Sequence, residues 1–379
     1  MKKTAQKKQT GKVNVRAAVW SLIGCAIFLV ILFLIPSGYK FEVGIGAADA
    51  EVGTSTVARA LMPIPLDKAA YNRKLLAISH IPEASTTPEF LSGETTLWKT
   101  ASTSKLLWPA KITAYPNAGA ILPFKRIVAY YGNFYSKGMG VLGQYPEEVV
   151  IQKLLAEVAE WNAADPSTPV VPAIDYIAST AQLDPGKSGK YTARMPDSQI
   201  DIAIALAKKV NGIVILELQV GLSNLPTELP ILEKYLKMPE VHLALDPEFA
   251  MHGGARPGTV IGSFDAADIN FAANYLAKIV QENNLPPKVL VVHRFTHKMV
   301  TNYQNITPLP EVQIVMDMDG WGDPAKKKGT YKQVIYPEPV QFTGFKLFYK
   351  NDLLPPSTRM LQKDELLQLT PAPLFIQYQ

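Results

Sequence analysis

The sequence contains a single cysteine, Cys25, among its 379 residues. One thiol excludes an intramolecular disulfide, a cysteine-based zinc knuckle and a Cys-Cys redox pair. It does not decide the cellular compartment, because many bacterial surface proteins have no disulfides. The apolar share of 47% and the charged share of 19% indicate a folded globular chain and not a disordered one.

Most of the chain also lacks an excess of positive charge. The formal net charge is +5, but six basic residues and no acid precede the first hydrophobic run: Lys2, Lys3, Lys7, Lys8, Lys12 and Arg16. Subtracting these six from the total of 38 leaves 32 basic residues against 33 acidic ones. The sequence therefore gives no reason to expect nucleic-acid binding.

One long hydrophobic run is present. Residues 17–36 read AAVWSLIGCAIFLVILFLIP without a charge, which is about the length that a helix needs to cross a hydrocarbon core of roughly 30 Å. The basic flank in front predicts that residues 1–16 form a cytoplasmic tail, that residues 17–36 form a single-pass transmembrane signal anchor, and that the rest lies outside the cell membrane.

The hydrophobic run has two alternatives to an anchor. Cleavage near residues 47–50 (AADA) would release a secreted protein, but the apolar core is longer than that of a usual secretory peptide. Residues 22–25 (LIGC) resemble a bacterial lipoprotein box, yet mostly large apolar residues follow Cys25 where a lipoprotein normally turns polar. An uncleaved anchor is the expectation that fits the sequence best.

Residues 37–125 are rich in Ser, Thr, Ala and Pro. Residues 68–79 predict one short helix, and three prolines within 106–124 suit an extended segment lying on a domain. This region is therefore expected to be an irregular stalk that becomes an N-terminal cap.

From residue 126 onward, strand-like and helix-like segments alternate. Eight strands are expected at 126–132, 170–177, 212–220, 241–249, 288–295, 312–318, 344–349 and 374–378. Helices are expected at 146–163, 197–210, 227–237, 266–283, 324–336 and 363–369, with only a short connection after the fifth strand. Eight strands over about 250 residues predict a (β/α)8 TIM barrel spanning 126–379.

An open doubly wound sheet is the alternative fold, and it would need a glycine fingerprint directly after the first strand. Residues 138–143 do read GxGxxG, but the first glycine lies six residues beyond that strand. Nucleotide binding is therefore not expected.

Polar residues gather at the carboxyl ends of the expected strands, where the active sites of such barrels lie. Side chains alternate between the two faces of a strand. One inward register fits the second to the eighth strand, and its polar residues are Asp175, Glu217, Gln219, Asp246, Glu248, His293, Asp317, Asp319, Lys346 and Gln377. Acids are almost never buried without partners. A ring of six acids, one lysine and one histidine thus predicts a functional pocket, although any one acid could equally cap a helix or pair with a neighbour.

Crowded carboxylates raise one another's pKa, so that one donates a proton while another stays ionised. Glycoside hydrolysis needs such a pair. We therefore expect the catalytic groups among Glu248, Asp246, Asp317 and Asp319. The substrate is expected to contact Asp175, Glu217, Gln219, His293, Lys346 and Gln377, with the aromatic faces of Tyr131 and Trp321 near the strand ends.

The segments MGVLG (139–143), LALDPE (243–248), VVHRF (291–295) and GFKLFY (344–349) resemble a family of bacterial extracytoplasmic (β/α)8 barrels of the glycoside-hydrolase type. The resemblance covers residues 126–379 and implies fold and location but no activity. Glycosidase barrels commonly place the acid/base at the end of strand 4, which would be Glu248, and Asp246-Pro247-Glu248 matches the Asp-x-Glu of chitinase-like members. The tyrosine of their strand 6 motif is absent, and strand 7 presents Lys346 instead of a nucleophile.

The leading hypothesis is a membrane-anchored extracytoplasmic glycoside-hydrolase-like protein that acts on a cell-envelope glycan without a cofactor. A barrel that binds a glycan or wall polymer without turnover is one alternative. A metal-dependent phosphodiesterase is another, with Mg²⁺ or Ca²⁺ held by the oxygens of Asp246, Glu248, Asp317 and Asp319.

Overall fold

The computed structural model describes residues 65–81, 86–91, 95–100, 107–110 and 112–379. The chain divides into two compact units, Met1–Ala60 and Leu61–Gln379, and only the second contains described residues. The tail predicted at 1–16, the anchor at 17–36 and the start of the stalk fall outside the described residues and stay predictions. Within the described ranges, no helix has the length and apolar character needed to span a bilayer.

Eight parallel strands close into a barrel, which confirms the predicted fold. Going round the ring, β4 pairs with β14, β14 with β13, then β12, β10, β8, β7 and β5, and β5 pairs with β4 again. Their bounds are β4 (Arg126–Gly132), β5 (Val170–Ala181), β7 (Ile213–Leu218), β8 (Val241–Leu245), β10 (Lys288–Arg294), β12 (Val312–Met318), β13 (Phe342–Leu347) and β14 (Phe375–Tyr378). The short β6 (Thr192–Arg194) adds an antiparallel edge to the end of β5.

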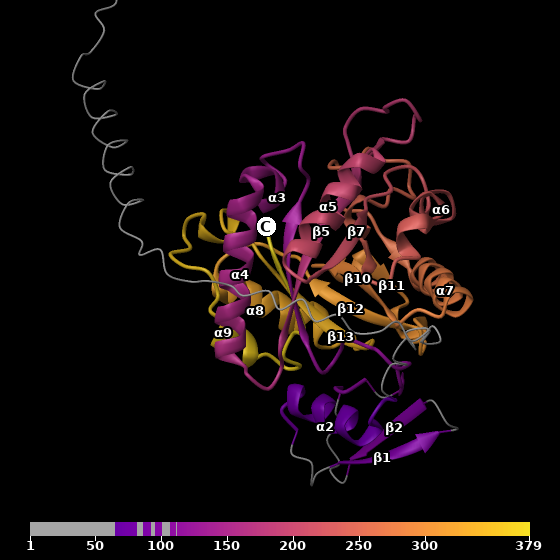
Figure 1. Ribbon diagram of the computed structural model, residues 1–379, viewed down its shortest axis with the longest axis vertical. Helices are drawn as coiled ribbons and strands as arrows, with labels where there is room; N and C mark the ends of the chain where they lie inside the picture. The colour runs from indigo at the N-terminus through magenta and orange to yellow at the C-terminus, as the bar shows by residue number, and fades with distance from the viewer. Residues whose placement is uncertain (1–64, 82–85, 92–94, 101–106, 111) are drawn as a thin grey trace, which may run out of the picture. The chain divides into compact units, whose positions relative to one another are not determined.

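Helices cover the outside of the ring (Figure 1). They are α4 (Glu147–Ala164), α5 (Asp197–Lys209), α6 (Leu225–Leu236), α7 (Ala266–Asn283), α8 (Pro324–Thr330) and α9 (Lys363–Leu367), and a one-turn α3 (Val141–Gln144) follows β4. The α7 start carries a capping box of Asp265 and Asp268, which satisfies free N–H groups at the helix end. Residues 295–311, all described, contain no α-helix, so the predicted short connection after β10 is confirmed.

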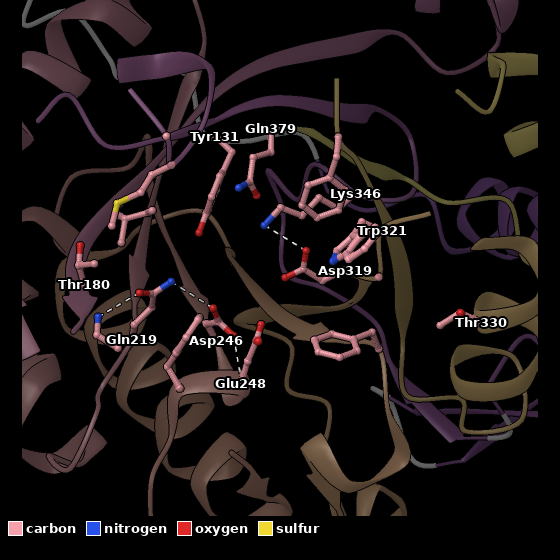
Figure 2. Close-up of a pocket in the computed structure, with 18 of the residues that line it drawn as sticks. Tyr131, Thr180, Gln219, Asp246, Glu248, Asp319, Trp321, Thr330, Lys346 and Gln379 are labelled. Atoms are coloured by element: carbon pink, nitrogen blue, oxygen red, sulfur yellow. Dashed lines mark hydrogen bonds and ion pairs between the residues drawn. The ribbon is translucent and has the colours of Figure 1, made fainter. Parts of the chain in front are cut away.

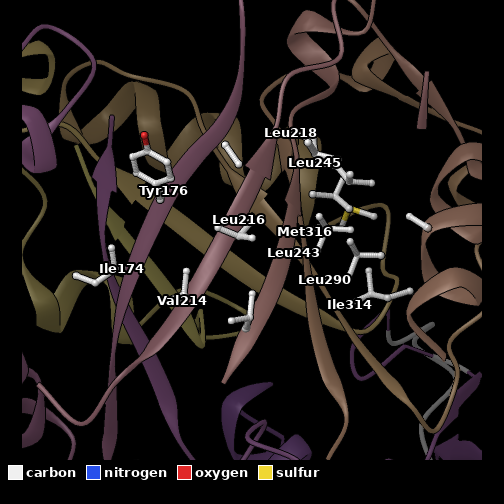
Figure 3. Close-up of a cluster of buried hydrophobic side chains, with 14 of the residues drawn as sticks. Ile174, Tyr176, Val214, Leu216, Leu218, Leu243, Leu245, Leu290, Ile314 and Met316 are labelled. Atoms are coloured by element: carbon white, nitrogen blue, oxygen red, sulfur yellow. The ribbon is translucent and has the colours of Figure 1, made fainter. Parts of the chain in front are cut away.

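The outward faces of the strands form a continuous apolar layer under these helices (Figure 3). Leu243 and Leu245 on β8 and Ile314 and Met316 on β12 are almost completely buried in it, as their alternation with polar residues predicted. Burying apolar side chains gives roughly 25 cal/mol per Å² removed from water. This layer therefore fixes the register, and with it the polar residues that point inward.

The inside of the barrel is apolar toward the amino ends of its strands. Inward residues such as Ile127, Val291 and Phe375 pack there against Tyr71 and Leu75 of α2 (Lys68–Ile78). The N–H of Ala70 is held by the Asp67 side chain, which starts the helix. The predicted short helix is thus confirmed, and it closes the end of the barrel opposite the polar ring.

The segment in front of the barrel is more regular than the sequence indicated. Three antiparallel strands, β1 (Thr86–Leu91), β2 (Thr95–Thr100) and β3 (Ile112–Ala114), form a small sheet where an irregular stalk was expected. β2 reads TTLWKT, and β-branched and aromatic residues favour strands even between polar neighbours. The abundance of Thr in these segments therefore favours a sheet and not an irregular chain.

One strand end and one helix end also differ from expectation. The strand predicted at 241–249 ends at Leu245, and residues 247–249 form a 3₁₀ turn, η2 (Pro247–Phe249). Pro247 has no N–H to give to a sheet ladder, and the Asp246 side chain accepts the N–H of Glu248 instead. The helix predicted at 324–336 has the right extent but finishes as a π-helical turn, η5 (Tyr331–Ile335).

Candidate functional site

A pocket of about 520 Å³ opens at the carboxyl ends of the barrel strands. Seven of the predicted site residues line it: Tyr131, Gln219, Asp246, Glu248, Asp319, Trp321 and Lys346. Figure 2 shows them arranged around one space, with Lys346 and Asp319 on one side and Gln219 and Asp246 on the other. Each comes from the end of a strand or the loop after it, which is where a barrel of this kind places its chemistry.

Lys346 on β13 and Asp319 after β12 form the charged centre of this pocket. The Lys346 Nζ lies 3.1 Å from Asp319 Oδ1 and 3.8 Å from the centre of the Tyr131 ring. Burial opposes the charge of the ammonium, but Asp319 and Glu217 outweigh it and raise the pKa of Lys346. The lysine is therefore a permanent cation that pairs with Asp319.

Asp246 and Glu248 lie at the opposite rim. Asp246 Oδ1 accepts the N–H of Glu248 at 3.0 Å, and Oδ2 accepts Gln219 Nε2 at 3.2 Å. Burial, and then the charge of Glu217, raises the pKa of Asp246 well above its usual value. With both oxygens accepting N–H groups, Asp246 holds the η2 turn in place.

The Glu248 carboxyl is half-buried, and no described side chain donates a hydrogen bond to it. Burial, and then the negative charge of Asp319, raises its pKa, although Lys346 opposes the shift. Figure 2 shows the Glu248 oxygens turned toward the pocket and not toward the protein interior. A carboxyl in this setting keeps its proton to higher pH than a free glutamate and can donate it to a ligand.

A second polar layer lies below the pocket floor, centred on His293 of β10. Its Nε2 is 3.0 Å from Glu217 Oε2, and its Nδ1 is 3.2 Å from Asp317 Oδ2 and 3.4 Å from Asp319 Oδ2. Burial disfavours the imidazolium, but Glu217, Asp317 and Asp319 raise the pKa of His293 well above its usual value. The ring N–H directions miss the acid oxygens, so these contacts are ion pairs and not aligned hydrogen bonds.

The acids of this lower layer differ in charge state. Burial would raise the pKa of Glu217, but His293 and Lys346 outweigh it, and the Tyr131 hydroxyl donates to Oε1 at 2.8 Å. Glu217 is therefore ionised. Burial, and then the charge of Glu217, raises the pKa of Asp175 to about 8, so this carboxyl is protonated at neutral pH.

Asp317 of β12 is fully buried between β10 and β13, beside Gly344. Burial raises its pKa, while His293 opposes the shift. A Cβ at Gly344 would lie 2.4 Å from Asp317 Oδ1. The absence of a side chain at Gly344 therefore provides the space that the Asp317 carboxyl occupies.

The structure places the predicted site residues at two depths. Seven of the twelve predicted residues face the pocket, as given above, whereas five lie beneath its floor: Asp175, Glu217, His293, Asp317 and Gln377. A substrate in the pocket can reach Glu248 and Asp319 but not Asp317.

The four oxygen ligands proposed for Mg²⁺ or Ca²⁺ do not converge. Among the described residues, one group of acids and histidines has ligand atoms mutually within 4.8 Å, and it consists of Asp175, Glu217 and His293. Asp246, Glu248, Asp317 and Asp319 lie at different heights, with Lys346 and His293 beside them. A hard-cation site on those four residues is therefore a wrong expectation.

Several pocket residues were not predicted. Phe249, Phe295 and Phe348 line the pocket, as does Met139 from the loop after β4. Each phenylalanine comes just after the end of β8, β10 or β13, a position that could have identified it. Lys326 of α8 gave no such signal; its Nζ lies 4.6 Å from the centre of the Trp321 ring.

No protein-family model matches the sequence, and the search of curated proteins found no match either. Solved structures do resemble the fold. A Bacillus subtilis mannanase shares 11% identity at a TM-score of 0.36, over 67% of this chain and 79% of its own. A Bacteroides ovatus GH5 xyloglucanase shares 12% identity at a TM-score of 0.35, over 77% of this chain and 79% of its own. The Plasmodium falciparum HPPK-DHPS shares 12% identity at a TM-score of 0.32, over 82% of this chain and 51% of its own.

The strand order defines the class of the protein as a (β/α)8 barrel. Glycoside hydrolases of families 26 and 5 are among the solved structures that resemble it. At these low TM-scores the neighbours transfer no activity to this chain. Its chemistry has to be argued from its own residues.

Proposed function

We propose that this protein is a glycoside hydrolase in which Glu248 donates a proton to the glycosidic oxygen and Asp319 acts on the other side of the bond. The observation that carries this proposal is the pairing of a free, half-buried carboxyl of raised pKa with an ion-paired carboxylate across one open pocket. Two carboxyl groups of opposite protonation state are what glycoside hydrolysis requires.

Glu248 is the better proton donor of the two rim acids. Both oxygens of Asp246 are engaged by N–H groups, so its orientation is fixed by the protein. Glu248 has no such engagement among the described residues and faces the pocket. As the C1–O bond breaks, the proton of Glu248 passes to the departing oxygen, so that the leaving group is a neutral alcohol.

Asp319 is the ion-paired counterpart. Lys346 Nζ lies 3.1 Å from one of its oxygens, and His293 Nδ1 lies 3.4 Å from the other. This carboxylate either attacks C1 or removes a proton from the attacking water, and the configuration of the released sugar distinguishes the two routes. Asp317, below the floor, is assigned to positioning His293 and not to contact with substrate.

The walls of the pocket suit a sugar ring. Trp321 is 47% exposed although it lines the pocket, and Phe249, Phe295 and Tyr131 lie on its other sides. A large exposed aromatic beside a polar cavity is a surface for apolar sugar faces to pack against. We also propose that the glycan belongs to the cell envelope, because the basic tail and apolar run predict a membrane anchor with the barrel outside.

The proposal is tested with wild type, Glu248→Gln, Asp319→Asn and the control Glu282→Gln, whose carboxyl lies on the exposed face of α7. Each protein is incubated with soluble mannan, xyloglucan and purified cell-wall glycan, and new reducing ends are counted. Wild type and control should cleave one of them, and both pocket variants should lose about 10²–10⁴-fold in rate.

Two other outcomes decide against hydrolysis. If calorimetry shows that wild type and both variants bind a glycan but none of them releases reducing ends, the protein is a glycan-binding barrel. If no glycan is bound or cleaved, the proposed substrate class is wrong.

A further inference from the structure

Below the pocket floor, three buried side chains from three strands converge. Asp175 of β5, Glu217 of β7 and His293 of β10 are each fully buried, and one ligand atom from each lies within 4.8 Å of those of the other two. The proposed hydrolysis uses His293 Nδ1, which lies beside Asp319, but neither His293 Nε2 nor the carboxyl groups of Asp175 and Glu217. The cluster therefore needs an explanation of its own.

In each acid of the cluster, one oxygen accepts hydrogen bonds from described residues and the other accepts none. Glu217 Oε1 accepts the Tyr131 hydroxyl at 2.8 Å and Gln219 Nε2 at 3.2 Å, whereas no described donor hydrogen-bonds Oε2. Asp175 Oδ2 accepts Gln377 Nε2 at 2.6 Å, whereas Oδ1 likewise has no described hydrogen-bond partner. Buried polar atoms are rarely left in this state unless an ion or water completes them.

His293 shows the same division between its two nitrogens. Its Nδ1 faces the carboxylates of Asp317 and Asp319 at 3.2 and 3.4 Å, and its Nε2 faces the free oxygen of Glu217 without hydrogen-bond alignment. A histidine that binds a metal through one nitrogen usually has a carboxylate behind the other, which fixes the orientation of the ring. Asp317 and Asp319 stand in that supporting position.

The spacing also suits a shared ion. His293 Nε2 and Glu217 Oε2 are 3.0 Å apart. Two ligands about 2.1 Å from one ion are separated by about 3.0 Å at the right angle of an octahedral site and by about 3.4 Å at the wider angle of a tetrahedral site. Without an ion, a proton has to lie between His293 Nε2 and Glu217 Oε2. A metal cation would replace that proton.

We propose that Asp175, Glu217 and His293 bind a divalent transition-metal ion of the zinc, manganese or ferrous class. One imidazole and two carboxylates are the ligands that such ions prefer, whereas Mg²⁺ and Ca²⁺ favour oxygen alone. The ion lies under the floor and does not touch the glycan. It ties together β5, β7 and β10 and, through His293, sets the position of Asp319.

The test is metal analysis of the purified full-length chain, grown in metal-replete medium and freed of loosely bound ions by gel filtration. We expect about one divalent ion per wild-type chain. Glu217→Gln should lose it, because the amide is a poor ligand of nearly the same size. Glu248→Gln makes the same chemical change at the pocket rim and should keep the ion.

A second measurement does not depend on metal acquired during growth. Chelator-treated wild type receives Zn²⁺ or Mn²⁺, and the thermal midpoint should rise by several degrees, because an ion that binds only the folded state stabilises it. Glu217→Gln should show no such rise, and its circular dichroism would show that it is folded.

Two results overturn the proposal: a wild-type chain that holds no ion and gains no thermal stability from either one, or a Glu217→Gln variant that binds as much ion as wild type. Metal content is measured without any substrate. A failure of the glycosidase proposal therefore leaves this result intact, and the reverse also holds.

Discussion

Replacing Glu248 with glutamine removes the proposed proton donor and very little else. The Glu248 carboxyl has no hydrogen bond from a described side chain, so the free energy of unfolding should change by no more than about 0.5 kcal/mol. General acid catalysis contributes about 10²–10⁴-fold, which corresponds to about 3–5 kcal/mol of transition-state stabilisation. A large loss of rate with almost no loss of stability is therefore the expected result.

The assay compares two leaving groups on one sugar. A 2,4-dinitrophenolate departs without a proton, so Glu248→Gln should cleave the dinitrophenyl glycoside with a first-step rate close to that of wild type. An alkyl alcohol needs the proton, so the alkyl glycoside should show the full loss. Asp319→Asn should slow both substrates. An equal loss of Glu248→Gln on both glycosides would refute the assignment of Glu248 as the acid.

Three further predictions concern Trp321 at the pocket rim, Lys346 in the charged centre of the pocket, and the helix α2 that closes the barrel. Trp321→Ala should raise KM for a polysaccharide about tenfold, by about 1.4 kcal/mol of lost stacking, with an unchanged melting temperature. Burial and Asp319 raise the pKa of Glu248 while Lys346 lowers it; Lys346→Met should therefore raise that pKa further and move the alkaline limb of the kcat/KM profile to higher pH. Leu75→Ala, in the helix that closes the barrel, should cost about 2–5 kcal/mol in urea unfolding, and a cost below 1 kcal/mol would show that α2 does not stabilise the barrel.

The barrel could be predicted from the sequence because its strands have two different faces. β4 and β12 begin and end at the predicted residues, since apolar outward positions alternate with inward ones over their whole length. The small sheet in front could not be predicted in the same way, because among the described strands β2 pairs only with β1 and β3. Their alternation is too short and too polar to distinguish a strand from an extended loop.

The depth of each site residue is a property that alternation cannot give. Asp317 at the end of β12 and Asp319 just after it were predicted on the same face, yet Asp317 lies below the pocket floor and Asp319 lines the pocket. Their heights depend on the stagger between neighbouring strands, which places Asp317 beside His293 and Gly344. The alternation along a strand shows only whether a side chain points into or out of the barrel. Its position along the barrel axis is set only when the ring of strands is closed.

The pairing of β14 between β13 and β4 has a consequence for how the protein is made. β4 is the first barrel strand to leave the ribosome, and the strand that completes one of its sides is the last. Throughout synthesis of the barrel, β4 therefore keeps one row of backbone N–H and C=O groups without a partner, and such an edge invites pairing with another chain. Nascent copies on neighbouring ribosomes would be exposed to one another during this interval. A holdase that covers this edge, or slow initiation that spaces the ribosomes apart, should raise the yield of folded protein more than a change in temperature would.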